Sequence, residues 1–443
     1  MLTNHWKIEE GLEKQAGIKN IPDFKNRKEI VVIGINNKDL QPEWADNKTR
    51  VLVNGYADDG NLSDCVIETE KGSFNFLSIE KYNININNFE RIIKNLIYER
   101  YYQQNPPFHS RLPINYTKIP ISLRNFLFDI VLKLKTDPKW PEWPVEKSVE
   151  LIRYLYIKSV SLLLRKRIPH VSFWPYKKKF AIAVTHDCDT ESSFNNIDKI
   201  RDIEKKYSIN SCWNVLSNKY RINREKLRKL KDECCEIGLH GYNHDNKTPF
   251  LKKGEIIERI MSASKIMQEF DIKGFRSESL LRNKEFLELL SNYFQYDSST
   301  CDTDIYSPVA IRSGTSTVFP FFIKNMVEIP VTLPQDYRLM RLNKTKNEIF
   351  NIWKDKVDFI RQINGAVVLL THPDSHIFGN DKYLDVYERI LKYLTRFDDG
   401  WITTPCEIAN WWVERDKIVL KNGQFTNSKR ATISYIESKN RTL

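Results

Sequence analysis

Long apolar runs are missing from this chain of 443 residues. No stretch approaches the roughly 20 consecutive apolar residues that a membrane-spanning helix needs. The first ten residues also lack the basic start and apolar core of a signal peptide. We therefore expect a cytoplasmic protein with no transmembrane segment. The seven cysteines are odd in number and show no paired spacing, which predicts reduced thiols.

Several common catalytic motifs are missing as well. The sequence holds no Gly-x-Ser-x-Gly motif, which excludes the nucleophile elbow of the α/β-hydrolases. The stretch Gly11–Lys19 lacks the lysine and hydroxyl residue of a phosphate loop in the required register. There is no internal repeat and no low-complexity tract, so a solenoid or a disordered chain is not expected.

Hydrophobic residues make up 41% of the chain and aromatic residues 12%, enough to build real cores. The formal net charge is +12. Such a charge suits an acidic partner such as nucleic acid, an anionic glycan or a membrane surface. A lysine-rich composition spread over a solvated surface also explains the charge, and we favour this interpretation. No nucleic-acid partner is expected.

Changes in pattern divide the chain into four parts. The β-branched runs Glu29–Ile35 and Arg50–Asn54 predict strands, and the spacing of apolar residues predicts helices over Asn88–Gln103 and Val145–Arg165. We expect an N-terminal α+β domain of unknown role over 1–145, a helical and basic connector over 146–170, a catalytic domain over 171–415 and a C-terminal tail over 416–443.

From Phe180 onwards, short apolar runs alternate with helical stretches, which predicts an α/β barrel. The apolar runs are Phe180–Val184, Ser211–Leu216, Glu236–Leu239, Gly274–Arg276, Phe294–Tyr296, Val327–Val331, Ala366–Leu370 and Trp401–Thr404. The helical stretches are Arg221–Lys231, Glu255–Phe270, Asn283–Tyr293, Lys346–Ile363 and Asp381–Tyr393. In such barrels the functional side chains gather at the carboxyl ends of the strands.

Polar side chains follow these runs at the expected places. They are Asp187, Asp189, His240, His244, Arg276, Asp297 and His372. Two imidazoles and one carboxylate can hold a divalent ion and leave a position open for water. The spacing of four residues lets His240 and His244 face one ion. His372 and His376 share that spacing, and there we expect one functional histidine and one surface histidine.

The order of these motifs resembles the polysaccharide deacetylases with a NodB-homology domain. The resemblance covers about Pro169 to Trp412. Its motifs are Thr185-x-Asp187-x-Asp189, His240-x-x-x-His244, Gly274-Phe275-Arg276-Ser277, Tyr296-Asp297-Ser298-Ser299, Leu370-Thr371-His372-Pro373 and the closing Trp401-Ile402-Thr403-Thr404-Pro405.

The resemblance implies a distorted (β/α) barrel that removes acetyl groups from N-acetylated, in some members O-acetylated, sugars. By position, Asp187 corresponds to the general base and His372 to the general acid. His240 and His244 correspond to the metal histidines, and Arg276 to the arginine that orients the base. The expected cofactor is Zn²⁺, with Co²⁺, Mn²⁺ and Ni²⁺ as alternatives. A backbone N–H just beyond Arg276 is expected to help polarise the acetyl carbonyl.

One motif departs from the family pattern. The family has two adjacent aspartates, the second of them a metal ligand, but here Cys188 takes that position and Asp189 follows. Alternating strand side chains would point Asp187 and Asp189 to the same face. We therefore expect Asp189 to be the third ligand, with a Cys188 thiolate as the alternative. Asp297 is expected to hydrogen-bond His372 or to line the site, and Asp302 and Asp304 compete for that role.

Two other functions stay open beside a carbohydrate deacetylase that acts on an N-acetylated sugar or polysaccharide precursor. Because the aspartate motif departs from the family pattern, a catalytically inactive, glycan-binding barrel is one alternative. Two Asp-x-Asp motifs, at Asp187 and at Asp302, are compatible with a sugar-nucleotide glycosyltransferase. That alternative leaves His240, His244 and His372 without a role.

Overall fold

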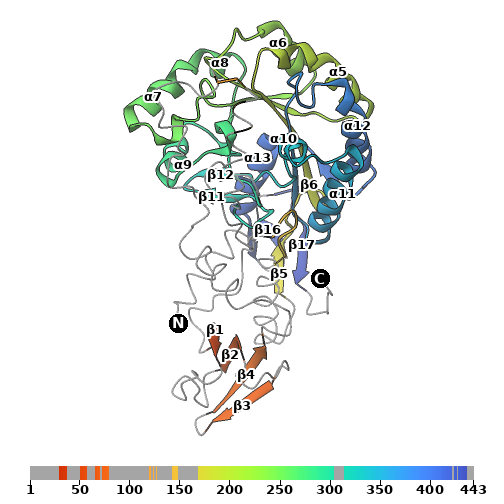
Figure 1. Cartoon of the computed structure of the whole chain (residues 1–443). Coiled ribbons are helices and arrows are strands. Elements are labelled where there is room, and N and C mark those ends of the chain that lie inside the picture. The colour runs from red at the N-terminus through yellow and green to blue at the C-terminus, as the bar shows by residue number, and fades with distance from the viewer. Residues whose placement is uncertain are drawn as a thin grey trace. The chain divides into compact units, whose positions relative to one another are not determined.

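The chain divides into two compact units, shown in Figure 1. The first comprises Met1–Arg100, Lys147–Ser172 and Asp416–Leu443, and the second, the barrel unit, comprises Tyr101–Glu146 and Phe173–Arg415. The sequence-based boundaries placed 101–145 in the N-terminal domain, and most of these residues lie outside the described part of the chain. The computed structural model describes residues 29–36, 50–56, 65–69, 72–78, 119, 120, 123, 126, 142–147, 168–303, 314–421, 424–426 and 428–436.

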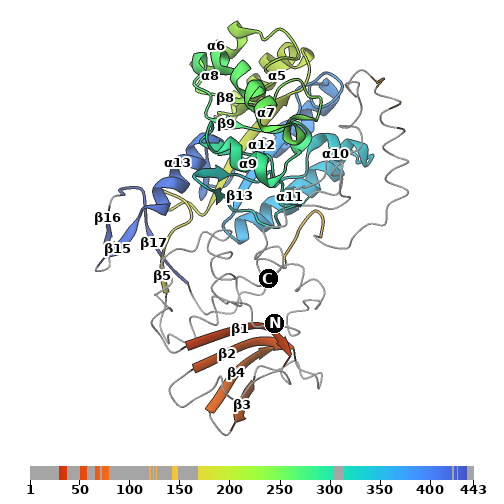
Figure 2. The same cartoon turned by 90° about the vertical axis from the view of Figure 1, so that its left-hand side faces the viewer.

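A four-stranded sheet is described in the first unit, in the order β1-β2-β4-β3 (Figure 2). Its strands are β1 (Glu29–Asn36), β2 (Arg50–Tyr56), β3 (Cys65–Thr69) and β4 (Gly72–Ser78). β2 is parallel to both β1 and β4, and β3 is antiparallel to β4. The two strands predicted here are confirmed, whereas the helix predicted over 88–103 and nearly all of that over 145–165 lie outside the described residues.

Further strands of the first unit lie where only a connector and a tail were expected. β5 (Ile168–Val171) pairs antiparallel with β17 (Ile433–Ile436), and β15 (Val419–Lys421) pairs with β16 (Gln424–Thr426). Each of these strands has three or four residues. Runs this short do not stand out from a charged sequence, because a strand signal needs about four to eight alternating residues.

The barrel unit is built on a sheet of nine described strands in the order β11-β12-β10-β9-β8-β7-β6-β13, with β14 paired to β6. All neighbours are parallel except β11 and β12. The strands are β6 (Phe180–Cys188), β7 (Cys212–Val215), β8 (Glu236–Leu239), β9 (Gly274–Phe275), β10 (Tyr296–Asp297), β11 (Phe321–Ile323), β12 (Met326–Glu328), β13 (Ala366–Thr371) and β14 (Gly400–Ile402).

Backbone hydrogen bonds beyond the strands join the two ends of this sheet. The N–H groups of Thr332 and Leu333, which follow β12, donate to the carbonyl of Val368 in β13 at 3.2 and 3.1 Å. A single parallel bridge also links Cys301 to Val331. The sheet therefore curls back on itself, which confirms the predicted distorted (β/α) barrel.

Helices pack around this sheet, as Figure 1 shows. They are α5 (Ser192–Lys206), α6 (Arg224–Asp232), α7 (Lys253–Ser262), α8 (Ser264–Glu269), α9 (Lys284–Leu290), α10 (Asp336–Arg341), α11 (Lys346–Gln362), α12 (Asp381–Thr395) and α13 (Pro405–Asp416), with 3₁₀ turns η7 (Thr248–Phe250) and η8 (Glu278–Leu280). The helix predicted over Glu255–Phe270 is divided at Ala263. α5 was not predicted, because the face that it buries includes the polar residues Asn196, Arg201 and Glu204.

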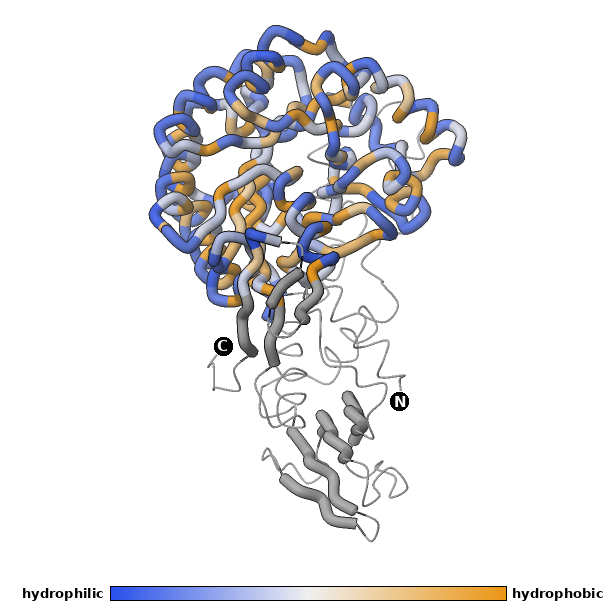
Figure 3. Tube along the Cα trace, turned by 180° about the vertical axis from the view of Figure 1, so that it is seen from behind, coloured by the Kyte–Doolittle hydropathy of each residue, from blue (hydrophilic) through white to orange (hydrophobic). Residues whose placement is uncertain are grey.

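The core lies between the strands and these helices. Every residue of β6 and β13 is buried, as expected for parallel strands covered on both faces. In Figure 3 the hydrophobic colour runs along the strands, whereas the helices alternate between hydrophobic and hydrophilic positions.

Within the described part of the chain, no helix has the length and apolar character needed to span a bilayer.

Candidate functional site

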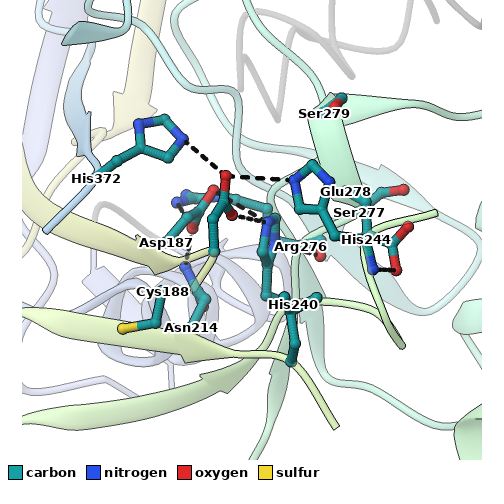
Figure 4. Close-up of polar contacts among 12 residues, drawn as sticks. Asp187, Cys188, Asn214, His240, His244, Arg276, Ser277, Glu278, Ser279 and His372 are labelled. Atoms are coloured by element: carbon teal, nitrogen blue, oxygen red, sulfur yellow. Dashed lines mark hydrogen bonds and ion pairs between the residues drawn. The ribbon is translucent and has the colours of Figure 1, made fainter. Parts of the chain in front are cut away.

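The predicted polar residues meet at the carboxyl ends of the parallel strands. Asp187 is the penultimate residue of β6, and Asp189 follows that strand directly. His240 follows β8, Arg276 follows β9 and His372 follows β13. Figure 4 shows the side chains of these strand ends converging around Asp187.

Asp189, His240 and His244 form a group with the geometry of metal ligands. One ligand atom from each lies within 4.8 Å of the others. Nε2 of His240 is 3.1 Å from Oδ1 of Asp189, and Nε2 of His244 is 3.3 Å from Oδ2. Oδ1 is buried yet makes no hydrogen bond. Two nitrogens and one oxygen aimed at a common point fit a divalent cation with an open coordination position.

The ring of His240 is oriented by a hydrogen bond on its far side. Nδ1 lies 3.1 Å from the backbone carbonyl oxygen of Arg276. A carbonyl oxygen can only accept, so Nδ1 carries the proton, and loss of the proton on Nε2 would leave the lone pair of Nε2 free for a metal ion. A metal-binding histidine needs this tautomer, and such a partner fixes it.

Asp187 has the environment of an ionised base. Its Oδ1 accepts hydrogen bonds from Nδ2 of Asn214 at 2.8 Å and from Nη1 of Arg276 at 3.0 Å. Burial raises the pKa of this carboxyl, but the charges of His240 and Arg276 outweigh burial and lower the pKa below its ordinary value. Asp187 is therefore a carboxylate at neutral pH, as a general base must be.

Arg276 is held rigidly enough to orient Asp187. Its Nη1 donates to Oγ1 of Thr185 at 2.8 Å as well as to Asp187. Nε donates to the carbonyl of Ser298 at 3.0 Å, and Nη2 donates to the hydroxyl of the same residue at 2.9 Å. The guanidinium is thus fixed on three sides, and the side chain is 1% exposed.

His372 has the environment of a protonated acid. Nδ1 donates to Oδ1 of Asp336 at 2.7 Å, and the backbone N–H of His372 donates to Oδ2 at 2.6 Å. Burial lowers the pKa of this imidazole, but Asp336 outweighs burial and raises the pKa to about 10. His372 is thus an imidazolium at neutral pH, and its Nε2 lies 4.0 Å from Oδ2 of Asp189.

A comparison with curated proteins finds one relative that is similar in sequence over half of this chain. A peptidoglycan deacetylase of Helicobacter pylori is 22% identical over 260 residues, covering 50% of this chain and 84% of that protein. The predicted resemblance to polysaccharide deacetylases is confirmed. No family model matches the chain.

Matches among solved structures span a similar share of the chain. A protein of Mycobacterium smegmatis that is assigned as a polysaccharide deacetylase has 18% identity and a TM-score of 0.44, covering 55% of this chain and 93% of that chain. An allantoinase has 16% identity and a TM-score of 0.45, with the same shares of 55% and 93%.

Asp297 does not take its expected place in the deacetylase-type barrel. It was expected to hydrogen-bond His372 or to line the site, but it lies in β10 directly beside Glu328 of β12. Its two carboxyl oxygens accept from the N–H and the hydroxyl of Ser299. The partner of His372 is Asp336, which lies five residues beyond the end of the predicted run Val327–Val331 and therefore did not stand out in the sequence.

The competing candidates for this role also lie elsewhere or are not described. Asp302 forms a buried ion pair with Lys356 and does not contact His372. Asp304 lies outside the described residues. The backbone N–H expected to polarise the acetyl carbonyl just beyond Arg276 would be that of Ser277, but it donates to Oγ of Ser299 at 2.8 Å.

Cys188 is turned away from the ligand group of the deacetylase-type barrel. It stands between Asp187 and Asp189, so an extended chain points its side chain to the opposite face. Figure 4 shows its sulfur directed away from His240 and His244. Burial raises the pKa of this thiol well above its usual range, which disfavours a thiolate. The geometry therefore favours Asp189 over Cys188 as the third ligand.

The Asp297–Glu328 pair leads to a prediction about pH and stability. Burial, followed by the neighbouring Glu328, raises the pKa of Asp297 well above its ordinary value. Above the unfolded pKa of about 4, the folded chain therefore holds a proton that the unfolded chain has lost, and stability falls as pH rises. Asp297→Asn should reduce this fall by up to about 1.4 kcal/mol per pH unit. Urea unfolding between pH 5 and 8 measures it, and parallel slopes in the two proteins would contradict the buried proton.

Proposed function

We propose that this chain is a metal-dependent deacetylase that removes the acetyl group from an N-acetylated sugar or polysaccharide precursor. The observation that carries the proposal is the placement of a carboxylate held by Arg276 and an imidazole held by Asp336 beside one ligand group. Asp187 is an ionised carboxylate and His372 is a protonated imidazole. Amide hydrolysis needs both, since one proton must be taken from water and one given to the leaving nitrogen.

Asp187 is arranged to take the proton from water. Arg276 and Asn214 both donate to its Oδ1. Oδ2 lies 3.8 Å from Nε2 of His240, on the side of the ligand group. One oxygen thus fixes the carboxylate, and the other is directed towards the position where water would be activated.

His372 is arranged to give a proton to the leaving amine. Asp336 occupies its Nδ1, so the proton on Nε2 is the one that can be transferred. The carboxylate of Asp336 also stabilises the imidazolium until the nitrogen of the substrate becomes basic. Transfer at that stage lets the tetrahedral intermediate collapse to acetate and a free amine.

We propose Zn²⁺ as the ion held by Asp189, His240 and His244. Two imidazoles, one carboxylate and an open position are the donor set of many hydrolytic zinc sites, although Co²⁺, Mn²⁺ and Ni²⁺ accept the same donors. A bound ion of this kind would lower the pKa of a water molecule and polarise the acetyl carbonyl.

The two alternatives explain less of the site. A glycosyltransferase would use an Asp-x-Asp motif for a diphosphate, but Asp302 is buried in its pair with Lys356. An inactive glycan-binding barrel would not need a base, an acid and a ligand group in one place. The deacetylase accounts for all of them.

Acetate release tests the proposal. We expect acetate from at least one substrate in a panel of N-acetylated sugars, nucleotide sugars and oligosaccharides. A strong chelator should stop the release, and added Zn²⁺ should restore it. Release that continues in chelator would contradict the metal mechanism, and transfer of labelled sugar without acetate would favour the glycosyltransferase.

A further inference from the structure

The loop that connects the two metal histidines has an unfavourable backbone. His244 and Asn246 have φ angles of +59° and +61°, and Gly241 has +67°. Residues other than glycine adopt this left-handed conformation uncommonly, asparagine and histidine more readily than most, and contacts with the surroundings help to hold it. The position of His244 therefore depends on contacts that hold the loop.

One carboxylate supplies those contacts. Oε1 of Glu278 accepts the backbone N–H groups of Tyr242, Asn243 and His244 at 2.9, 3.0 and 2.8 Å. Oε2 accepts the N–H of Asn246 at 2.8 Å. Glu278 is 1% exposed. Both of its oxygens are thus directed at the loop, so the carboxylate serves the loop rather than a substrate.

The loop and Glu278 are also fitted to each other in shape. A Cβ atom on Gly241 would lie 2.8 Å from Cγ and 2.9 Å from Oε1 of Glu278, closer than real Cβ atoms come. The segment that carries Glu278 is strained too, since Ser279 and Leu280 have φ angles of +53° and +55°. Oγ of Ser279 donates to Oδ1 of Asn246 at 3.2 Å, which adds a second link between the two segments.

We propose that Glu278 is a positioning residue that pre-forms the metal site by fixing the loop between His240 and His244. This inference rests on the metal site of the proposed function. Charge-assisted hydrogen bonds are about twice as strong as neutral ones. Four of them hold Nε2 of His244 opposite Asp189 before any ion binds. Without this carboxylate the loop relaxes, and the binding of the ion must first reorder it.

Glu278→Gln tests this role with a side chain of the same shape. The amide keeps one acceptor oxygen, but its NH₂ group faces the N–H of at least one loop residue. We expect the dissociation constant for Zn²⁺ to rise by about 10- to 100-fold, the usual effect of removing a supporting partner. kcat should recover when Zn²⁺ is saturating, which separates a positioning residue from a catalytic one. Direct titration with Zn²⁺ and with Co²⁺, whose visible spectrum reports ligand geometry, measures the change.

Glu236→Gln is the matched control, because Glu236 begins β8 and lies at the end of that strand away from His240. Its oxygens accept from the hydroxyl of Tyr296 and the N–H of Cys406. This variant should bind Zn²⁺ as the unaltered protein does. Equal affinities for Zn²⁺ in the unaltered protein and Glu278→Gln, together with a lowered melting temperature, would overturn the proposal by showing a purely structural role.

Glu278→Asp provides a second measurement, which decides the matter if Glu278→Gln does not fold. It keeps the charge but shortens the reach, so we expect an intermediate affinity, and an unchanged one would overturn the proposal. The metal titration does not depend on turnover. Weakened Zn²⁺ binding in a chain that releases no acetate would support the role of Glu278 and contradict only the deacetylase activity.

Discussion

His240→Ala and His244→Ala should each lose bound metal and reduce acetate release to background. Each substitution removes one of three donors, and the remaining imidazole and Asp189 then hold an ion much more weakly. Metal content after dialysis and acetate release in the presence of added Zn²⁺ are the two measurements. We expect the loss of affinity to exceed the roughly 10- to 100-fold effect of removing a supporting partner.

The second histidine pair of the same spacing gives a matched control. His376 lies four residues after His372 but is exposed, so His376→Ala should leave metal content and turnover unchanged. A full complement of metal together with full turnover in either the His240 or the His244 variant would mean that the metal binds elsewhere.

Asp187→Asn should lower kcat by roughly 10²–10⁴ while metal content stays the same. The asparagine Oδ1 can still accept from Asn214 and Arg276, so the local structure should persist. What disappears is the carboxylate that accepts a proton from water. Steady-state acetate release and metal analysis on the same sample measure the two effects separately.

Asp297→Asn is a suitable comparison for this change. It also converts a buried aspartate at the end of a barrel strand, but Asp297 contacts Ser299 and Glu328 rather than the histidines. We expect this variant to retain turnover. If Asp187→Asn instead lost its metal, Asp187 would be a ligand, and the base would have to be found elsewhere.

The strands and site residues that could be predicted from the sequence are those marked by a pattern of neighbouring residues. Apolar runs located eight of the nine described barrel strands to within a few residues and missed only β11. The rule that functional residues follow such runs brought together Asp187, His240, Arg276 and His372. The same rule placed Asp189 next to the two histidines, because alternation along an extended chain needs no knowledge of the rest of the fold.

The site residues that the sequence did not reveal act through contacts between segments that are distant along the chain. Asp336 lies 36 residues before His372, and Glu278 lies 34 residues after His244. Neither carboxylate directly follows a predicted apolar run, whereas Asp297 does. Only the register of β10 against β12 shows that Asp297 faces Glu328 instead of the site.

The backbone hydrogen bonds that close the barrel, from Thr332 and Leu333 to Val368, also help to hold Asp336 beside His372. Thr332 and Leu333 lead within a few residues to Asp336, and Val368, their hydrogen-bond partner, leads to His372. A fluctuation that parts these backbone groups would separate the imidazole from its carboxylate. On the proposed mechanism, acetate release would then stop while most of the fold was still intact. We therefore expect mild denaturant to abolish acetate release at a lower concentration than the one that unfolds the chain.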